Sequence, residues 1–334
     1  MILVTGGTGF LGHSLLPLLR AHDYPVRVLT RQPEAHPWLR ELSANVVQAD
    51  ITHPDAVRLA AQNTEAIIHA AGLFRFMAAR DEFEATNSQG TENVLRAAVE
   101  VGVRRVVLVS TIAVAGWPTD PTQAIDEDTP PRPWDDYQRT KLAAEQRALA
   151  YARDERLEVV IVRGGAFYGP HGRYAFNKLF FEDPLINRLP MGVDGGRHIT
   201  FPAYIKDVAQ GVLLALEKGQ SGEIYNIASQ SLAHREVERT IAHLAGTSSW
   251  RLHAPSRLMI PVARMLTQFS KLRGQETLYV ANMQPYILGE WNVSIEKARR
   301  ALGYEPTPFE QGVRETLQWY AETGLWKPKK GYNA

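Results

Sequence analysis

The feature that most constrains the fold of this chain is a glycine-rich stretch at residues 5–12, Thr-Gly-Gly-Thr-Gly-Phe-Leu-Gly. An apolar run at residues 2–4 precedes it, and apolar residues at helical spacing follow it: Phe10, Leu11, Leu15, Leu18 and Leu19. In a strand–turn–helix unit, glycines let the backbone approach a pyrophosphate, and the helix N-terminus offers unpaired N–H groups. The glycines fit either Gly7-x-Gly9-x-x-Gly12 or Gly6-x-x-Gly9-x-x-Gly12. This context favours dinucleotide binding over an ordinary capped turn.

The end of the second predicted strand, residues 26–29, bears on the choice of cofactor. A carboxylate about 20 residues after the glycines usually binds the ribose hydroxyls of NAD. Here the strand is followed by Thr30 and Arg31, without a carboxylate. A guanidinium suits a 2′-phosphate in both charge and geometry, so Arg31 favours NADP, with NAD as the alternative. Arg31 could also be a solvated loop charge.

Apolar strand patterns alternate with helical patterns along the first two thirds of the chain. The strands are predicted at residues 2–4, 26–29, 46–49, 66–70, 106–109, 158–163 and 222–227, and helices at 53–61, 84–101 and 136–152, with Gly102 as a C-cap. This alternation predicts an α/β fold with a doubly wound parallel sheet. Further helices are predicted near 234–245, 255–272 and 310–320, and residues 164–191 as a loop region around a pocket.

These patterns predict two domains. Residues 1–165, completed by about 198–227, would form a dinucleotide-binding Rossmann domain. Residues 166–197 and 228–334 would form a smaller, mostly helical cap that binds the substrate.

A tyrosine and a lysine in the 136–152 helix are candidate catalytic residues. Tyr137 and Lys141 are four residues apart and would project from the same side of the helix. An ammonium beside a phenol lowers the phenol's pKa and makes it a better acid–base group. The fifth strand ends in two hydroxyls, Ser110 and Thr111, at the edge where doubly wound sheets bind ligands. A helix-surface pair is the alternative explanation.

Composition limits the partners that we expect. The net charge of the 334-residue chain is +1, which signals neither a nucleic-acid nor a membrane-surface partner. Cysteine is absent and the ten histidines form no metal-binding pair, so we expect no disulfide and no metal site. Neither a signal peptide nor an apolar run of membrane-spanning length is evident, so a cytoplasmic protein is expected.

Together, these segments resemble the extended short-chain dehydrogenase/reductase superfamily, the NAD(P)-dependent epimerase/dehydratase family. The matching motifs cover almost the whole chain: residues 5–12, Asp50-Ile51, residues 69–72, residues 87–91, Ser110-Thr111 through Gly116, Tyr137 to Lys141, residues 167–170, residues 204–209 and residues 297–304. The resemblance implies an enzyme with a Rossmann fold that transfers hydride between NAD(P) and a carbonyl or alcohol. A homodimer, common in the superfamily, is also expected.

The resemblance implies a role for each matching residue. Contacts to the cofactor are implied for Gly6, Thr8, Gly9, Phe10, Leu11 and Gly12 at the pyrophosphate, Asp50 and Ile51 at the adenine, and Ala70, Ala71, Gly72, Ser110 and Gly164 toward the nicotinamide. Thr111 would orient the substrate oxygen, Tyr137 would be the acid–base group, Lys141 would bind the ribose and tune Tyr137, and Asn87 would support the active-site helix. The family often has Arg-Pro where this chain has Arg163-Gly164.

Within the superfamily, two branches and one binding function remain open. Arg31, the apolar loop 73–77 and the aromatic run 176–181 resemble the dihydroflavonol-reductase and 3β-hydroxysteroid-dehydrogenase-like branch, which implies a small, apolar substrate contacted by Phe74, Phe76, Phe167 and Phe176. A nucleotide-sugar epimerase or dehydratase is the alternative, with Arg173, Asn177 and Arg197 as polar contacts. The third is a non-catalytic NAD(P)-binding protein. The aromatic residues could also be ordinary core.

Overall fold

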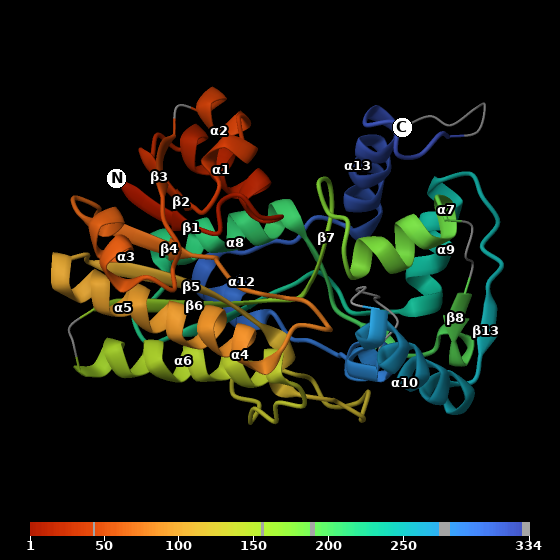
Figure 1. The fold of residues 1–334 in the computed structure, drawn as a ribbon. Coiled ribbons are helices and arrows are strands. Elements are labelled where there is room, and N and C mark those ends of the chain that lie inside the picture. Colours follow the sequence, from red (N-terminus) through yellow and green to blue (C-terminus); the bar gives the residue numbers. More distant parts are fainter. Residues whose placement is uncertain (43, 155–156, 188–190, 274–280, 329–334) are drawn as a thin grey trace.

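A seven-stranded parallel sheet forms the larger part of the molecule within the described residues, which are 1–42, 44–154, 157–187, 191–273 and 281–328 of a computed structural model (Figure 1). The strand order is β11-β6-β5-β4-β1-β2-β3. The strands are β1 (Ile2–Thr5), β2 (Val26–Thr30), β3 (Asn45–Gln48), β4 (Ala66–His69), β5 (Arg105–Thr111), β6 (Glu158–Gly164) and β11 (Ile224–Ile227). The order runs outward in both directions from β1, which confirms the predicted doubly wound fold.

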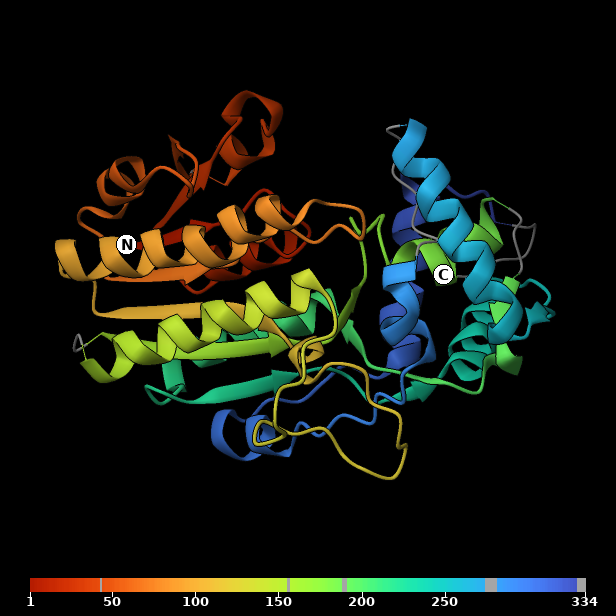
Figure 2. The same ribbon diagram turned by 60° about the horizontal axis from the view of Figure 1, so that its bottom comes forward.

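Helices cover both faces of this sheet because alternate strand residues point to opposite sides. In β1, Ile2 and Val4 pack into one buried cluster with α1 and α8, whereas Leu3 packs into a second with α3, α5 and α6 (Figures 1 and 2). The helices next to the sheet are α1 (Gly12–Ala21), α2 (Trp38–Glu41), α3 (Pro54–Ala61), α4 (Arg80–Phe83), α5 (Gly90–Val101), α6 (Asp136–Asp154), α8 (Ile205–Lys218) and α12 (Glu296–Leu302).

A π-helical turn, Glu84–Gln89, joins α4 to α5, so that the chain is helical from residue 80 to residue 101. The predicted helix 84–101 is therefore confirmed, and Gly102 ends it with φ +76°. Helix α8 lies outside the predicted helices. Most of its residues are buried.

Short strands and helices form a second region, the cap, by which we mean the described residues within 166–204, 228–293 and 305–328. Its strands pair as β7 (Ala166–Tyr168) with β10 (Pro202–Tyr204), β8 (Met191–Val193) with β13 (Leu252–Ala254), and β9 (Ile199–Thr200) with β12 (Leu232–Ala233). Its helices are α7 (Asp183–Leu185), α9 (His234–Leu244), α10 (Ser256–Arg273), α11 (Gln284–Leu288) and α13 (Phe309–Glu322). The C-terminal region is thus mostly helical, as predicted.

The prediction of an irregular loop over residues 164–191 was partly wrong. This segment contains β7, a π-helical turn at Lys178–Glu182, α7 and the first residue of β8. Phe176, Phe180 and Phe181 are buried on one side of the helical part. The glycines and prolines before and after it obscured this short pattern in the sequence. Residues 188–190 lie outside the described residues.

Helix α12 packs against α8 and β11, beside the sheet and away from the other helices of the C-terminal part (Figure 2). The Lys218 ammonium donates a hydrogen bond to the Leu302 carbonyl at 3.2 Å, which ties α8 to the end of α12. The predicted cap range 228–334 therefore includes a helix that belongs spatially to the sheet region.

Candidate active site

The turn between β1 and α1 uses the glycines of the wider register. Gly6 has φ +73°, and a Cβ there would lie 2.5 Å from the Ala71 nitrogen at the end of β4. A Cβ at Gly12 would lie 1.8 Å from the Gly7 oxygen. Around Gly9, by contrast, a Cβ would meet just the Gly6 oxygen within 4 Å among the described residues. Gly6 and Gly12 are therefore required by the fold, and Gly9 keeps the outer side of the turn open.

A buried chain of hydrogen bonds connects this turn to the helix that follows β4. The Thr5 hydroxyl lies 2.6 Å from His69 Nδ1, and His69 Nε2 lies 3.0 Å from the Thr91 hydroxyl. Thr91 donates its hydrogen to the Asn87 carbonyl at 2.6 Å, so His69 Nε2 carries the hydrogen and Nδ1 accepts that of Thr5. The Thr5 oxygen in turn accepts the Ala71 N–H at 3.3 Å. The imidazole is neutral, because burial lowers the pKa of His69 to about 3.

The Asn87 side chain holds the loop after β4 against α6. Its Oδ1 accepts the Leu73 N–H at 2.7 Å, and its Nδ2 donates to the Leu73 carbonyl at 3.1 Å and to the Thr140 hydroxyl at 3.3 Å. Asn87 is fully buried. It therefore fixes the position of a loop that borders the open side of the sheet.

Tyr137, Lys141 and Thr111 meet at the carboxyl end of β5. Tyr137 lies in the first turn of α6, and its phenol lies close enough to the Thr111 hydroxyl for that hydroxyl to lower its pKa. The Thr111 oxygen also accepts the Ala113 N–H at 3.2 Å. One helical turn after Tyr137, the Lys141 ammonium donates to the Val109 carbonyl at 2.7 Å. The i, i+4 spacing thus places a phenol, a hydroxyl and an ammonium at one strand end.

The protonation of this group differs from the sequence expectation. We expected Lys141 to lower the pKa of Tyr137, but burial raises that pKa above its usual range, and the lowering by the Thr111 hydrogen bond is smaller. Burial also lowers the pKa of Lys141 to about 8, although Glu145 opposes this shift. Desolvation dominates both groups here, so Tyr137 is a protonated acid at neutral pH.

Aromatic side chains surround Tyr137. The Phe74 ring centroid lies 4.7 Å from that of Tyr137, and Phe83 lies at 6.2 Å from the other side. Phe76 packs against Phe74 at 5.1 Å and against Tyr286 at 5.4 Å. A small pocket opens here, lined by Phe74, Arg75, Phe76, Ala78, Phe83, Asp135, Asp136, Tyr137, Asn282 and Tyr286. Aromatic rings thus make up half of the lining beside the candidate acid, and most of the other lining residues are polar or charged.

Two tyrosines were missed in the sequence analysis: Tyr286, which lines this pocket, and Tyr174, which contacts one of its lining residues. Tyr286, from the cap, donates to Asp135 Oδ2 at 2.9 Å and accepts from the Gln138 amide at 3.2 Å. The Tyr174 hydroxyl accepts the Phe76 N–H at 3.2 Å. Both tyrosines are distant in the chain from the residues that they contact, and no local pattern marks them.

Two of the predicted substrate contacts, Phe167 and Phe176, are not among the rings found against Tyr137 in the described residues. Phe167 packs edge-on against Phe10 of the glycine turn at 6.5 Å, and a Cβ at Gly164 would lie 2.4 Å from its ring. Phe176 is buried in the cap, 4.5 Å from the Phe180 ring. The structure therefore places Phe74 and Phe76 beside the candidate acid and Phe167 beside the turn.

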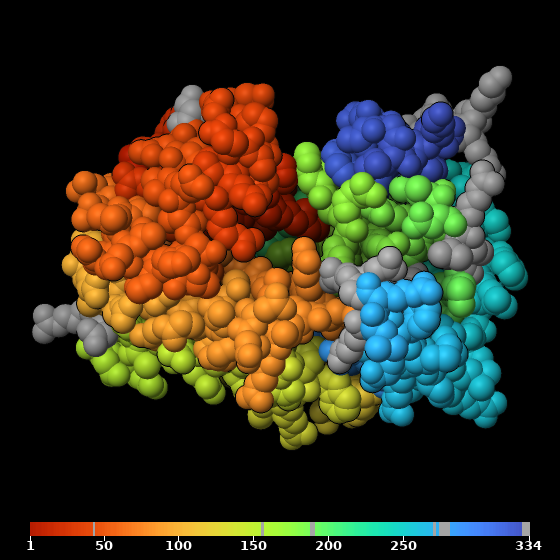
Figure 3. All heavy atoms as spheres, viewed as in Figure 1, coloured from red at the N-terminus to blue at the C-terminus, as the bar shows by residue number. Residues whose placement is uncertain are grey.

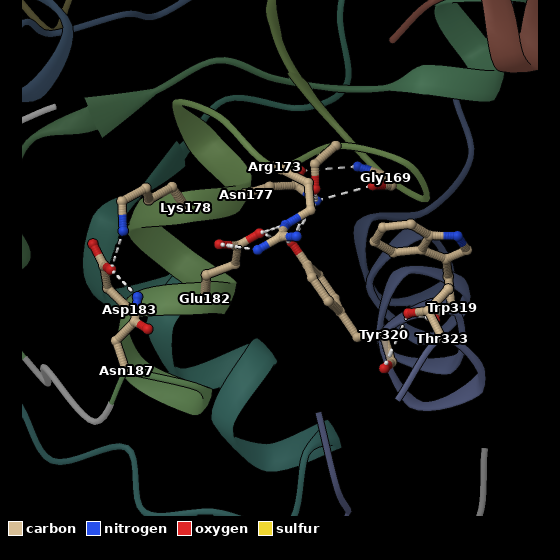
Figure 4. A network of polar contacts seen from close by, with 11 residues as sticks. Gly169, Arg173, Asn177, Lys178, Glu182, Asp183, Asn187, Trp319, Tyr320 and Thr323 are labelled. Carbon is tan, nitrogen blue, oxygen red and sulfur yellow. Dashed lines mark hydrogen bonds and ion pairs between the residues drawn. The ribbon is translucent and has the colours of Figure 1, made fainter. Parts of the chain in front are cut away.

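The polar groups considered for a nucleotide sugar are engaged within the cap (Figure 4). The Asn177 amide is fully buried and donates to the carbonyls of Gly169 and Gly172, both at 2.9 Å. Arg173 pairs with Glu182 at 2.6 Å. Outside the figure, Arg197 lies 3.7 Å from Asp194.

At the far end of the sheet edge, Arg31 and Asp50 follow β2 and β3. Arg31 is exposed. Although burial opposes it, the pKa of Asp50 is lowered by hydrogen bonds from Thr52 and by the Arg31 charge. Ile51 is buried, and its carbonyl accepts the Asn93 amide at 2.9 Å. A carboxylate and a guanidinium are thus held near each other where the adenosine end of a dinucleotide would bind.

These features fit a dinucleotide along the edge formed by the strand ends. The open glycine turn offers backbone N–H groups to a pyrophosphate, and Ala70, Ala71 and Gly72 extend from the turn toward Lys141. Ser110 Oγ is buried without a hydrogen-bond partner among the described residues, as expected of a group that meets a ligand. A hollow separates the N-terminal region from the cap at this edge (Figure 3).

Comparison with known proteins agrees with this geometry. Residues 2–228 match the model of the NAD dependent epimerase/dehydratase family. The chain is 31% identical to a 4-hydroxy-2-methyl-3-oxo-4-farnesyl-3,4-dihydroquinoline-1-oxide ketoreductase of Stigmatella aurantiaca, over 96% of each chain. It is 29% identical to a 2-alkyl-3-oxoalkanoate reductase of Stenotrophomonas maltophilia, over 94% of this chain and 97% of the relative.

Among solved structures, a double mutant of the dTDP-glucose 4,6-dehydratase DesIV of Streptomyces venezuelae, with NAD and DAU bound, superposes with a TM-score of 0.79. The two are 27% identical, and the match covers 98% of this chain and 99% of the other. Three observations agree. The family model matches two thirds of the chain, the relatives match over its full length, and the structure brings together the strand ends that carry the glycine turn, Thr111, Tyr137 and Lys141. The protein therefore belongs to the NAD dependent epimerase/dehydratase family and is an NAD(P)-dependent oxidoreductase of the extended short-chain dehydrogenase/reductase type.

Proposed function

We propose that the protein is an NADP(H)-dependent reductase of small apolar ketones. The observation that carries this proposal is the set of rings around Tyr137: Phe74, Phe76, Phe83 and Tyr286 line the pocket at the candidate acid. Aromatic walls suit an apolar substrate body, with a few polar groups to orient its carbonyl. The names of the two curated ketoreductase relatives, which describe alkyl and farnesyl ketones, support the same substrate class.

The chain's own residues account for substrate orientation and proton transfer. Because Thr111 already accepts the Ala113 N–H, its own hydrogen can be donated to a carbonyl oxygen held between Thr111 and Tyr137. The bound nicotinamide supplies the hydride to the carbonyl carbon. Tyr137 gives its phenolic proton to the substrate oxygen, which yields the alcohol and leaves a phenolate. Lys141, one helical turn away, stabilises that phenolate while its ammonium is charged.

The preference for NADP rests on Arg31. It follows β2 and is exposed, and the sequence has no carboxylate at this strand end. Replacing Arg31 with Ala should raise the Kd for NADPH by roughly tenfold or more and leave the Kd for NADH nearly unchanged, because an arginine–phosphate contact is charge-assisted. Arg20→Ala, at the exposed far end of α1, is the matched control. An equal effect on both cofactors would contradict the proposal.

A nucleotide-sugar substrate is less well supported. Asn177 is fully engaged with the backbone of its own loop, and Arg173 and Arg197 are paired with carboxylates of the cap. To bind a diphosphate, these side chains would have to give up the contacts that they make within the cap.

One steady-state experiment separates the two functions. NADPH oxidation is measured with a series of 2-alkyl-3-oxoalkanoates of increasing chain length and with dTDP-glucose. We expect kcat/KM to rise with chain length, and Phe74→Ala to reduce this dependence. Phe176→Ala, inside the cap core, serves as a control for the loss of an aromatic ring. If dTDP-glucose is turned over without net NADPH consumption and none of the ketones reacts, the protein is a dehydratase and the reductase proposal is wrong.

A further inference from the structure

Helix α10 has a continuous apolar face that is left exposed in the part of the chain that the structure describes. Its exposed apolar side chains follow each other at intervals of four and three residues, which puts them on one side of the helix: Leu258, Val262, Met265, Phe269 and Leu272. Leu272 is 86% exposed and Met265 65%. Trp250 and Leu252, directly before the helix in the chain, are also exposed. Soluble proteins rarely leave such a set uncovered, which makes this face a candidate binding surface.

The chain segment that contains this face has an excess of basic residues. From residue 239 to residue 275 the chain has six Lys and Arg residues and no Asp or Glu, whereas the whole chain has a net charge of +1. The rest of the chain therefore has a net charge of −5. Arg257, Arg264 and Arg273 are exposed on α10 itself, and the Arg273 guanidinium lies 4.2 Å over the Phe269 ring. The near-neutral total hides a strongly basic segment.

We propose that α10 binds the surface of an anionic phospholipid bilayer. A helix that combines an apolar face bearing Phe, Leu and Met with arginines and no acidic residue is typical of helices that lie in the headgroup plane. Arginines beside the apolar face attract anionic headgroups, and the apolar side chains enter the acyl boundary. At 18 residues, α10 would lie along about 27 Å of the surface.

Two alternative modes fit the helix less well. Spanning the membrane is excluded for the part of the chain that the structure describes, since no helix there is long and apolar enough. A second copy of the chain could cover the apolar face, but a symmetric contact would bring two arginine-bearing helices together without an acidic residue on either. An anionic surface satisfies both the charge and the apolar area.

The opposite side of α10 is attached to the rest of the cap and, through it, to the pocket. The Thr267 hydroxyl accepts the Ala281 N–H at 3.1 Å, and the neighbouring Asn282 donates to the Phe76 carbonyl at 3.1 Å. At the start of the helix, the Ser256 N–H is bound by Asp194 at 2.7 Å. The apolar face is therefore displayed by an anchored helix, close to the aromatic pocket. Membrane binding itself does not depend on the proposed reductase activity.

The test is co-sedimentation of the full chain with phosphatidylcholine vesicles, with and without phosphatidylglycerol. We expect binding to the anionic vesicles, weakening as salt is added, and much weaker binding to phosphatidylcholine alone. Met265→Ser with Phe269→Ser should reduce binding at least about tenfold, because it removes apolar groups that would enter the acyl region of the bilayer. Arg257→Gln with Arg264→Gln should reduce it by roughly thirtyfold. Leu59→Ser and Arg20→Gln, both exposed on the sheet side, are controls that should bind normally.

Each other outcome would overturn the proposal. Absence of vesicle binding contradicts it, as does equal binding of the α10 variants and the controls, or equal binding to neutral and anionic vesicles. Sedimentation velocity is measured in parallel. Dissociation of an oligomer by Met265→Ser with Phe269→Ser, without vesicle binding by the unsubstituted chain, would assign the face to a second copy. Thermal melts of all variants check that they remain folded.

Discussion

The sheet region and the cap bury similar side chains but are specified in different ways. In the sheet region, short stretches of sequence carry most of the pattern: alternate strand positions feed two cores, and Gly12 is required by a backbone contact within its own turn, although Gly6 also meets Ala71 after β4. In the cap, the loop after β7 is held by Asn177 of the same loop and by Tyr320 of α13, whose hydroxyl donates to the Gly172 carbonyl at 3.0 Å (Figure 4). The sheet region thus follows mostly local patterns, whereas the cap loop also depends on a partner distant in the chain.

We expect the sheet region to supply the groups that react and the cap to supply groups that select the substrate. The acid, the hydroxyl and the lysine come from β5 and α6, whereas Tyr286 of the pocket comes from the cap. A change in the sheet region should therefore affect turnover, and a change in the cap should affect substrate choice or stability.

The largest expected effect is on turnover. Tyr137→Phe should lower kcat by about a thousandfold, because it removes the proton donor, with the Kd for NADPH nearly unchanged. Stopped-flow absorbance of NADPH and a fluorescence titration measure the two quantities. Tyr286→Phe, which removes a hydroxyl from the cap side of the same pocket, should mainly raise KM. Undiminished turnover in Tyr137→Phe would break the assignment of chemistry to the sheet region.

The next effect is on folding stability at two glycines. Gly12→Ala should destabilise the protein by roughly 3 kcal/mol, because the new Cβ would overlap the Gly7 oxygen. Gly246, after α9 in the cap, has φ +63° and open space around it, so Gly246→Ala should cost only about 1 kcal/mol. Urea denaturation gives both values. Equal costs would show that local sterics do not distinguish the two regions.

A third prediction tests the buried hydrogen bonds that hold the cap loop. Asn177→Ala should cost roughly 2 kcal/mol, because it removes the hydrogen bonds to the Gly169 and Gly172 carbonyls and leaves the buried Gly169 N–H without its acceptor. Arg173→Ala, four residues earlier, removes a half-exposed arginine from its pair with Glu182, which keeps the Tyr320 hydroxyl, and should cost less than about 1 kcal/mol. Both are measured by urea denaturation. A larger cost for Arg173→Ala would contradict the importance of the buried amide.

The smallest effect near neutral pH, which grows as the pH falls, concerns a property that both regions share, buried neutral histidines. Burial lowers the pKa of His69 in the sheet region and of His234 in the cap to about 3, while the unfolded chain titrates near the usual 6.5. Between these values the unfolded state binds more protons, so stability is full above pH 6.5 and falls as the pH drops toward 3. Each histidine adds up to about 1.4 kcal/mol per pH unit.

Urea denaturation across this pH range measures the slope. His234→Leu should make it shallower, whereas His243→Leu, at an exposed position of the same helix, should leave it unchanged. An unchanged slope in His234→Leu would mean that this side chain does not titrate on unfolding.

The sequence by itself determined the sheet and the catalytic set, because both depend on short-range geometry. The glycine turn, the alternating strands and the i, i+4 pair of Tyr137 and Lys141 are properties of neighbouring residues, and the carboxyl ends of parallel strands necessarily meet at one edge. The roles of these residues, and the predicted homodimer, remain predictions.

Only the tertiary structure decided which groups the cap brings to that edge and how burial affects them. It placed Tyr286 beside Phe76, put Phe176 inside the cap core, and engaged Asn177 and Arg173 with the cap itself. It also reversed the expected pKa shift of Tyr137, since desolvation depends on everything packed around a group and not on its neighbours in the chain. The exposed face of α10 follows from the same rule: apolar periodicity predicts a helix, but not whether anything covers it.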